Sequence, residues 1–274
     1  MQTKDFIRNF QKILSVCFLL VLILLICAFF LKRKYPHLSE LLPELKNYPI
    51  QEATVRENFS FDYRNTKYNV IPLAEYELWG MVVTHNNINT WYNFYHDKDS
   101  VNIKDLCVVW GDNIETGAYM AMKFKSGEWT CYTKYKRPVN RELVFKYNHD
   151  NLSNNHLLTD NPEVRQKIRN AKIGDQIYLK GFLAAYGEYG TDEKYYRSSS
   201  MSRTDHGNHS CETVFVEDFE ILKKANTVWY LIYSIGKYVL LLILALKFIL
   251  LVIEPNVMCR NISDKKIIDK YNFK

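Results

Sequence analysis

Residues 161–183, with the sequence NPEVRQKIRNAKIGDQIYLKGFL, decide the fold that this chain predicts. A helix is expected at their start, because either Asp160 or Asn161 suits the N-cap and Pro162 suits the first helical position. Apolar residues then recur at helical spacing until Gly174, which ends the helix. Residues 177–183 follow with side chains that alternate in character, the period of a strand with one buried face. The stretch therefore predicts a helix, a tight turn and a strand.

Two apolar runs lie near the ends of the 274-residue chain. Residues 13–31 carry no charge, and a longer run at 228–253 contains two lysines. Because roughly 20 apolar residues span a bilayer core, transmembrane helices are predicted at 13–31 and 226–253. A cleavable signal peptide is the alternative for the first run. That run is longer than the 7 to 15 residues or so of a signal peptide, and no Ala-x-Ala-like site follows it.

The net charge of +6 lies outside the central segment. Residues 32–225 contain 26 basic and 26 acidic side chains, so the surplus flanks the apolar runs. A nucleic-acid-binding module would have its basic surplus in the folded domain, so nucleic acid is not an expected partner. Basic flanks favour the cytoplasmic side of a membrane. Both termini are therefore predicted in the cytoplasm, although the basic triplet at 32–34 argues against this orientation.

These patterns divide the chain into six predicted parts, in a multi-pass protein of a bacterial-type inner membrane. A cytoplasmic head at 1–12 precedes the first membrane helix, and a connector at 32–62 follows it. An extracytoplasmic domain is predicted at 63–225, and a basic cytoplasmic tail at 254–274 follows the second membrane helix. No internal repeat is visible.

Alternating side chains predict further strands inside the domain. They are expected at 74–84, 105–111, 118–124, 129–135 and 212–222, and a turn at 125–128 makes a hairpin of the third and fourth. Residues 136–159 are polar and are predicted to be irregular. Strands, then one helix, then two further strands make up the predicted order.

That order resembles the OB-fold superfamily as found in bacterial envelope proteins. The resemblance depends on LWGMVV at 78–83, GDQIYLKGFL at 174–183 and VFVEDFEIL at 214–222. It implies a mainly β, OB-like small barrel with one helix, between two transmembrane helices. An SH3-like or other small mixed barrel is the alternative. OB-folds bind oligonucleotides, oligosaccharides or proteins, so the resemblance leaves the ligand open.

The chain has six cysteines, three of which fall in the predicted domain. A domain outside the cell allows one disulfide, and Cys107 with Cys131 is favoured because the two lie near successive predicted strands. The alternative is that Cys107, Cys131 and Cys211 are small buried hydrophobic residues.

A polar pocket is the candidate site. The segment 197–212 is dense in hydroxyl, basic and acidic side chains, and we ask whether it meets the polar segments near 110 and 154 on one rim of the barrel. The candidate residues are Trp110, Asn113, Asn154, Asn155, His156, Arg197, Ser199, Arg203, Asp205, His206, His209 and Glu212. The alternative is that these segments only form turns, which asparagine and serine favour.

Enzymatic chemistry is a second interpretation of the same segment. His206 and His209, with Cys211 or Asp205, offer ligands of the kind that zinc prefers, and a serine or histidine there offers hydrolase chemistry. The spacing matches no structural-zinc pattern, so no metal, cofactor or catalytic residue is assigned.

Lys237 and Lys247 lie within the second membrane run, where a lysine facing lipid is costly. They either contact a polar group on a partner helix or extend toward the bilayer surface. The first hypothesis for the whole chain is a membrane-anchored binding or scaffolding module of an envelope-associated complex. Its expected partners are the membrane and a protein or a second copy, with a glycan as an option. A hydrolase or metal enzyme, and a membrane-perturbing effector with two helices and a sensor domain, are the alternatives.

Overall fold

The computed structural model describes residues 2–88, 101–127, 129–205 and 210–271, with side chains described from residue 5 to residue 253 outside the gaps. The chain divides into two compact units. One unit contains the helices at the two ends of the chain, and the other is the domain Lys34–Ala225. The two units are described separately below.

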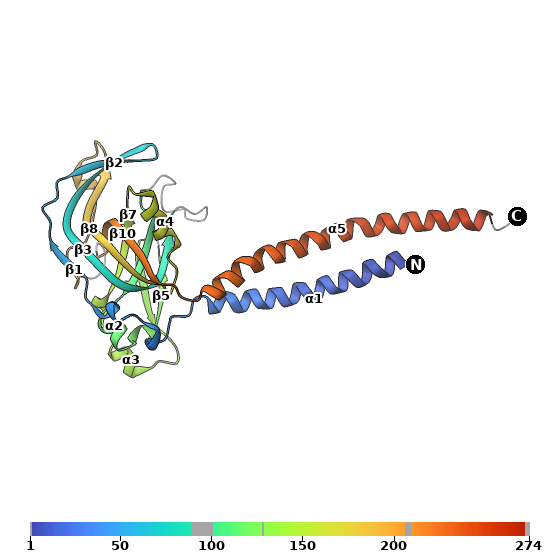
Figure 1. Ribbon diagram of the computed structural model, residues 1–274, viewed down its shortest axis with the longest axis horizontal. Helices are drawn as coiled ribbons and strands as arrows, with labels where there is room; N and C mark the ends of the chain where they lie inside the picture. The colour runs from blue at the N-terminus through green and yellow to red at the C-terminus, as the bar shows by residue number, and fades with distance from the viewer. Residues whose placement is uncertain (1, 89–100, 128, 206–209, 272–274) are drawn as a thin grey trace. The chain divides into compact units, whose positions relative to one another are not determined.

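The terminal unit consists of α1 (Gln2–Leu31) and α5 (Thr227–Tyr271) (Figure 1). Within them, Asp5–Leu31 and Thr227–Ile253 are long and apolar enough to cross a membrane. Both helices extend into the predicted head at 1–12 and tail at 254–274. Helix formation depends on backbone hydrogen bonds rather than on hydrophobicity, so polar flanks can continue an apolar helix. Two long apolar helices therefore flank a mostly β domain.

Close contacts join α1 and α5. A Cβ added to Gly236 would lie 2.8 Å from a methyl carbon of Leu25, so the glycine permits close packing at this point. Lys247 donates a hydrogen bond from Nζ to Ser15 Oγ at 2.9 Å. Lys237 Nζ lies 5.2 Å from the centre of the Tyr233 ring. The sequence left open whether Lys247 contacts a polar group on another helix. In the structure, Ser15 on α1 of the same chain is such a group.

The domain is built mainly from strands. They are β1 (Ile50–Ala53), β2 (Phe59–Tyr63), β3 (Thr66–Asn87), β4 (Lys104–Val109), β5 (Met122–Ser126), β6 (Cys131–Tyr135), β7 (Leu152–Leu158), β8 (Gln176–Glu188), β9 (Arg197–Ser198) and β10 (Glu212–Lys223). The helices are α2 (Asp112–Glu115), α3 (Arg141–Phe145) and α4 (Pro162–Asn170). Short 3-10 turns are η1 (Leu38–Glu40), η2 (Pro43–Lys46), η3 (Ala118–Ala121), η4 (His149–Asn151) and η5 (Glu193–Tyr195).

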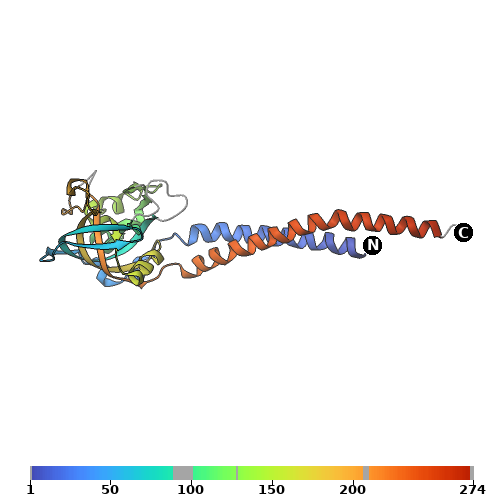
Figure 2. The same cartoon turned by 90° about the horizontal axis from the view of Figure 1, so that it is seen from above.

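Strand pairing produces a partly closed sheet. The order runs β3, β4, β7, β10 and β8, and β8 pairs again with β3. Only the β7–β10 pairing is parallel; the others are antiparallel. β3 and β8 are long and curved in Figures 1 and 2. Their length allows β3 to pair with β8 in its first two thirds and with β4 near its end.

Among the described residues, one of four apolar clusters lines the interior of this sheet, and α4 contributes Val164 and Ile168 to it. Asn161 caps α4 by accepting hydrogen bonds from two backbone amides of its first turn. At the other end, Lys104 Nζ donates to the carbonyl oxygens of Arg169 and Ala171 at 3.1 and 2.5 Å. A cation at a helix C-terminus is favourable, so β4 and α4 hold each other in place.

Several sequence predictions need correction. The predicted connector 32–62 is not a linker, because β1 and β2 within it pair with β3. Residues 152–158, expected to be irregular, form β7 in the middle of the sheet. The predicted strand at 118–124 begins as the turn η3 and becomes extended only at Met122. The domain therefore starts about thirty residues earlier than its composition indicated.

Cys107 and Cys131, the pair favoured from the sequence, form a disulfide. Cys107 lies on β4, whereas Cys131 begins β6 of the separate two-stranded sheet β5–β6. The bond therefore ties this hairpin to the main sheet.

Candidate functional site

A cavity of about 1120 Å³ lies where β6, β7, β9 and the start of β10 meet. Seven of the residues proposed from the sequence line it: Asn154, His156, Arg197, Ser199, Arg203, Asp205 and Glu212. Its size exceeds the range of about 300 to 1,000 Å³ that is usual for small-ligand pockets. The cavity therefore has room for an extended ligand rather than for one small molecule alone.

Strand β7 divides its polar side chains between two faces. Side chains alternate along a strand, so Ser153 and Asn155 share one face and Asn154 and His156 share the other. The hydrogen bonds agree, since Asn155 Nδ2 donates to Ser153 Oγ at 2.7 Å. On the other face, Asn154 Nδ2 lies 3.4 Å from His156 Nε2. The strand thus presents two polar clusters.

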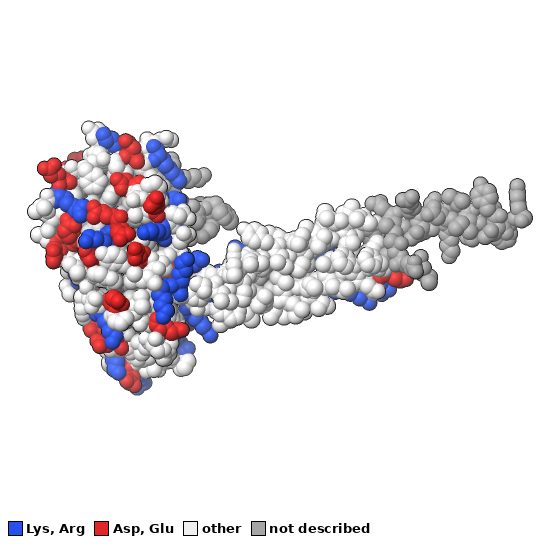
Figure 3. Space-filling view, in the orientation of Figure 1, with Lys and Arg blue, Asp and Glu red and all other residues white. Residues whose placement is uncertain are grey.

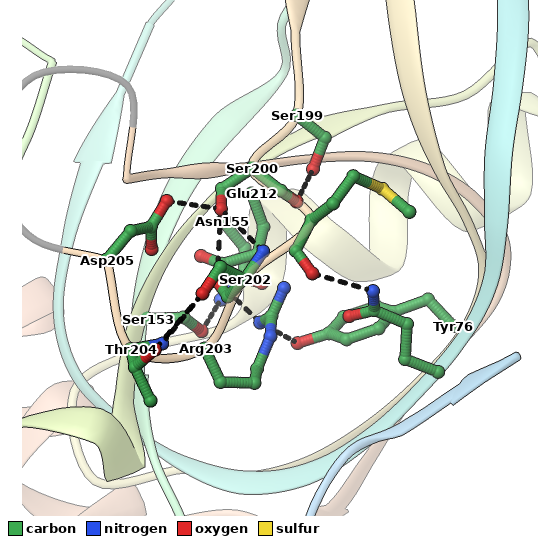
Figure 4. A network of polar contacts seen from close by, with 12 residues as sticks. Tyr76, Ser153, Asn155, Ser199, Ser200, Ser202, Arg203, Thr204, Asp205 and Glu212 are labelled. Carbon is green, nitrogen blue, oxygen red and sulfur yellow. Dashed lines mark hydrogen bonds and ion pairs between the residues drawn. The ribbon is translucent and has the colours of Figure 1, made fainter.

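The first cluster is centred on a buried ion pair. Arg203 reaches from the loop after β9 and bonds Glu212 through Nη1 and Oε1 at 2.6 Å. The same nitrogen lies 3.4 Å from the hydroxyl of Tyr76, which is fully buried on β3. Figure 4 shows Arg203 directed at Tyr76, with Glu212 and Asn155 beside it. Burial raises the pKa of Glu212 to about 7, although the charge of Arg203 opposes this shift.

Hydrogen bonds within the loop hold Arg203 in this position. Ser200 Oγ donates to Asp205 Oδ2 at 2.5 Å, and the backbone amide of Ser202 donates to Ser200 Oγ at 3.0 Å (Figure 4). Ser199 Oγ accepts from the backbone amide of Thr213 at 3.1 Å, which joins the loop to β10. The serine-rich sequence at 198–202 therefore builds a folded loop.

The second cluster contains a buried histidine and carboxylate. His156 Nδ1 and Asp105 Oδ1 are 2.5 Å apart, and both side chains are almost completely excluded from solvent. Burial would raise the pKa of Asp105, but the charge and hydrogen bond of His156 hold it below its ordinary value. Cys211 adjoins them, with Sγ 3.6 Å from Asn154 Nδ2. Burial raises the pKa of this thiol, which opposes formation of a reactive thiolate.

Aromatic side chains form part of the cavity wall. The guanidinium carbon of Arg197 lies 4.5 Å from the centre of the Trp129 ring. Trp129 is 43% exposed and Tyr132 is 55% exposed, so both rings keep surface available for contact. Tyr196 lines the same cavity. Such rings can stack on the faces of sugars or of other flat groups.

Five buried polar atoms of cavity-lining residues have no hydrogen-bond partner among the residues that the structure describes. Two are acceptor oxygens, Oε2 of Glu212 and Oδ1 of Asn154, and three can donate, namely Nε and Nη2 of Arg203 and Oγ1 of Thr213. A buried polar group without a partner costs about 1–3 kcal/mol, so a ligand that both donates and accepts hydrogen bonds would recover that cost.

Not every predicted residue belongs to the cavity. Trp110 is buried in the apolar interior, and Asn113 donates to the carbonyl oxygens of Asn148 and Asn151. Asn155 donates to Leu106 O and Ser153 Oγ, which is also a structural role. His206 and His209 lie outside the residues that the structure describes.

Sequence reasoning missed other residues of the cavity, among them Trp129, Tyr132, His149, Ser153, Tyr196 and Thr213. Three of them, Tyr132, Ser153 and Thr213, lie on strands that also build the fold, so the local sequence gave no sign that they line a cavity. The disulfide between Cys107 and Cys131 was the available clue, because it places the hairpin β5–β6 against the strand that neighbours β7.

Comparison with known proteins gives no relative from which a role for this site could be inferred. The sequence matches no protein-family model, and neither a curated protein nor a solved structure matches it. In the described part of the chain, no group of three or more His, Cys, Asp or Glu side chains is placed to hold a metal ion.

The described lining of the cavity offers groups that can bind a ligand. A nucleophilic thiol or hydroxyl needs a base within about 2.6–3.2 Å. In the described residues, the hydrogen bonds of His156 Nε2 include the Asn154 amide and no thiol or hydroxyl. Hydroxyls, amides, paired charges and aromatic rings instead line an open cavity.

Proposed function

We propose that this protein is a membrane-anchored binding module whose OB-like domain lies on the extracytoplasmic side of an inner membrane. Its cavity binds a neutral, hydroxyl-rich ligand of the glycan class. The main observation in support of a bound ligand is the cavity of about 1120 Å³, which has exposed aromatic rings and the unpartnered oxygens of Glu212 and Asn154. The following paragraphs give the support for each part.

The OB-like assignment is supported by the order of strands. An OB-fold is a five-stranded, partly open Greek-key barrel. The pairing β3–β4–β7–β10–β8, with β8 returning to β3, matches a five-stranded ring, and α4 lies between β7 and β8 in the sequence. Helix α4 contributes Val164 and Ile168 to the interior, as a helix that plugs a small barrel would.

The membrane anchoring is supported by the lengths of the apolar segments in α1 and α5. Their described surfaces are almost bare of charge over most of their length in Figure 3. Unpaired apolar surface of this extent is stable in lipid and unfavourable in water. The extracytoplasmic placement is supported by the basic termini and by the disulfide, since disulfides persist mainly in oxidising compartments.

The ligand class is supported by the balance of charge in the cavity. Arg203 is paired with Glu212, and Asp205 accepts a hydrogen bond from Ser200. Arg197 lies over the Trp129 ring, and the other lining groups include hydroxyls, one amide, two imidazoles and aromatic rings. Hydroxyls, amides and aromatic rings recognise neutral hydroxyl-rich surfaces by hydrogen bonding and stacking.

Two neighbouring asparagines allow a matched test of ligand binding. Chitotetraose and cellotetraose would be titrated onto the full chain in detergent micelles, and affinity would be measured by calorimetry. Asn154→Ala removes an amide that faces the cavity, so a loss of about tenfold in affinity is expected, at 1.4 kcal/mol for one hydrogen bond. Asn155→Ala removes the bonds to Leu106 and Ser153, so it lowers the thermal midpoint and leaves the affinity unchanged. The ligand class is wrong if neither sugar binds, or if both variants lose affinity equally.

The topology has its own test. Glu193→Cys places a thiol in the exposed turn η5, and an impermeant maleimide would be added to intact cells. Labelling above that of the unmodified chain is expected before lysis. Reaction only after lysis would place the domain in the cytoplasm and overturn the orientation.

A further inference from the structure

One short segment of the domain carries a surplus of positive charge. Residues 34–225 contain 24 basic and 26 acidic side chains. Residues 122–147, which include β5, β6 and α3, account for seven of the basic and two of the acidic ones. The rest of the domain therefore has 17 basic and 24 acidic side chains. A domain that is acidic elsewhere presents a single segment with a charge of +5.

The strand register places lysines together on the outer face of the β5–β6 hairpin. Lys123 is directly opposite Lys134, and Lys125 is opposite Tyr132. All four side chains are exposed, whereas the alternate residues Phe124 and Thr133 are partly buried. Like charges at directly opposed positions destabilise a hairpin. The pairing of Lys123 with Lys134 is thus unfavourable unless an outside anion compensates it.

The positive charge is not neutralised within the described structure. Among the described residues, Lys123, Lys125 and Lys134 form no ion pair, while Lys146 pairs with Glu142. Elsewhere on the domain, exposed basic residues such as Lys180 and Lys194 do have acidic partners. The hairpin face, defined as Lys123, Lys125, Tyr132 and Lys134, is therefore a basic surface next to the cavity, which Tyr132 also lines.

Exposed aromatic rings accompany these lysines. Tyr132 is 55% exposed and Tyr135 is 52% exposed, and Phe145 on α3 is 88% exposed. Interleaved aromatic and basic side chains are typical of membrane interfaces, where the rings enter the headgroup region and the cations meet phosphates.

The hairpin is fixed before any partner binds. The disulfide from Cys131 joins it to β4, and the backbone amide of Ser126 donates to Thr84 Oγ1 of β3 at 3.3 Å. At the other end, the amide of Lys136 donates to Ala121 O at 2.8 Å. Because the backbone is already held, little conformational entropy is lost on contact.

We propose that the hairpin face binds the anionic phospholipid headgroups of the membrane in which this chain is anchored. Protein interfaces are depleted in lysine, which makes a protein partner a poorer match for this surface. Nucleic acid is a poorer match because the rest of the domain is acidic. Each lysine near an anionic bilayer favours contact by about 1 kcal/mol, or about fivefold.

The proposal rests on the membrane anchoring proposed above, because the anchors determine which surface is near. The chain enters the domain at Lys34, three residues after α1 ends at Leu31. It leaves the domain at Ala225, two residues before α5 begins at Thr227. At no more than about 3.6 Å per residue, such short links keep the domain near the bilayer surface.

The test compares lysine reactivity in two membranes. The full chain would be placed in nanodiscs of phosphatidylcholine alone, or with one third phosphatidylglycerol, and labelled with a water-soluble acylating reagent. Mass spectrometry would give the rate at each lysine. We expect Lys123, Lys125 and Lys134 to react about fivefold more slowly in the anionic discs, and the difference to vanish in 0.5 M salt. Lys67 and Lys194, exposed elsewhere on the domain, are the matched controls and keep one rate in both discs.

The lipid contact would be overturned if the hairpin lysines were labelled at equal rates in the two kinds of disc. It would also be overturned if Lys67 and Lys194 were slowed in the anionic discs as much as the hairpin lysines. Failure of the chain to enter nanodiscs would instead overturn the anchoring itself, so the two proposals fail in different ways. A second measurement uses Lys125→Gln together with Lys134→Gln. This variant should bring the labelling rate of Lys123 in anionic discs to its value in neutral discs, and an unchanged fivefold difference would contradict the proposal.

Discussion

Strands β7 and β8 border β10 on its two sides, yet they are buried by different means. β8 is largely buried and has the apolar residues Ile177, Leu179 and Leu183 inside the sheet. β7 is buried along almost its whole length, but its middle is Ser-Asn-Asn-His. The buried side chains of β8 that pack in the core are apolar, whereas β7 needs hydrogen-bond partners for four polar side chains.

This difference separates the stabilising side of the sheet from its binding side. Burial of apolar side chains stabilises a fold with few geometric demands. Buried polar groups are stable only where each finds a partner. β7 leaves an oxygen of Asn154 without one in the described residues, next to the cavity. The missing hydrogen bond on β7 therefore lowers the stability of the fold, and a ligand in the cavity that donates to Asn154 would compensate for it.

The largest expected effect comes from breaking the β8 side. Gly181 pairs with Tyr76 on β3 and with Val216 on β10, and a Cβ there would overlap the carbonyl oxygen of Phe215. The obstacle is backbone on a neighbouring strand, so no side chain can move aside. Gly181→Val is expected to cost more than about 4 kcal/mol and to abolish the folded domain. Near-ultraviolet circular dichroism of the full chain would measure this loss.

Lys180→Ala is the matched control on the same strand. It removes an exposed ion pair with Glu77, so only a small change in the thermal midpoint is expected. A folded Gly181→Val protein with an unchanged thermal midpoint would show that β8 does not approach β10 this closely.

The same contrast explains what could be predicted from the sequence. Residues 161–183 have the periodicity of α4 and β8, and the structure contains both elements. Helix α4 ends at Asn170 rather than at Gly174, and β8 continues five residues beyond the predicted end at 183. β7 was predicted to be irregular because asparagine favours turns, and no local signal shows that tertiary hydrogen bonds will hold it extended. β1 and β2 were missed because their register depends on pairing with β3. Candidate residues in the 197–212 segment could be named, but the part of the cavity built by the hairpin could not.

A smaller effect is expected from removing the cover over β7. The disulfide holds the hairpin β5–β6, whose residue Trp129 accepts hydrogen bonds from Asn154 and Cys211. Replacing both Cys107 and Cys131 by serine is expected to cost about 3 kcal/mol, as for a loop of this length. The thermal midpoint would measure the loss, and alkylation of Cys211 should become faster because the hairpin no longer covers it. An unchanged midpoint and an unchanged alkylation rate would show that the hairpin is held without the bond.

The smallest expected effect concerns Glu212 and the pH dependence of protein stability. Glu212 is paired with Asn155 of β7 in the strand register, so this test bears directly on the polar side of the sheet. Its pKa is raised to about 7 by burial, so the unfolded chain loses this proton at lower pH than the folded protein.

The contribution of Glu212 to stability is therefore fully present below about pH 4.5 and is lost as the pH rises through 7. The pKa rises from 4.5 to about 7, so at about 1.4 kcal/mol per pKa unit the loss is at most about 3 kcal/mol. Glu212→Gln has no proton to lose, so it should match the parent chain at pH 4.5 and exceed it by that amount at pH 8. Thermal midpoints across this range would measure the difference, with Glu193→Gln as an exposed control. If Glu212→Gln instead loses stability relative to the parent as the pH rises, the attraction of Arg203 outweighs the cost of burial. The polar side of the sheet would then be stabilising without a ligand.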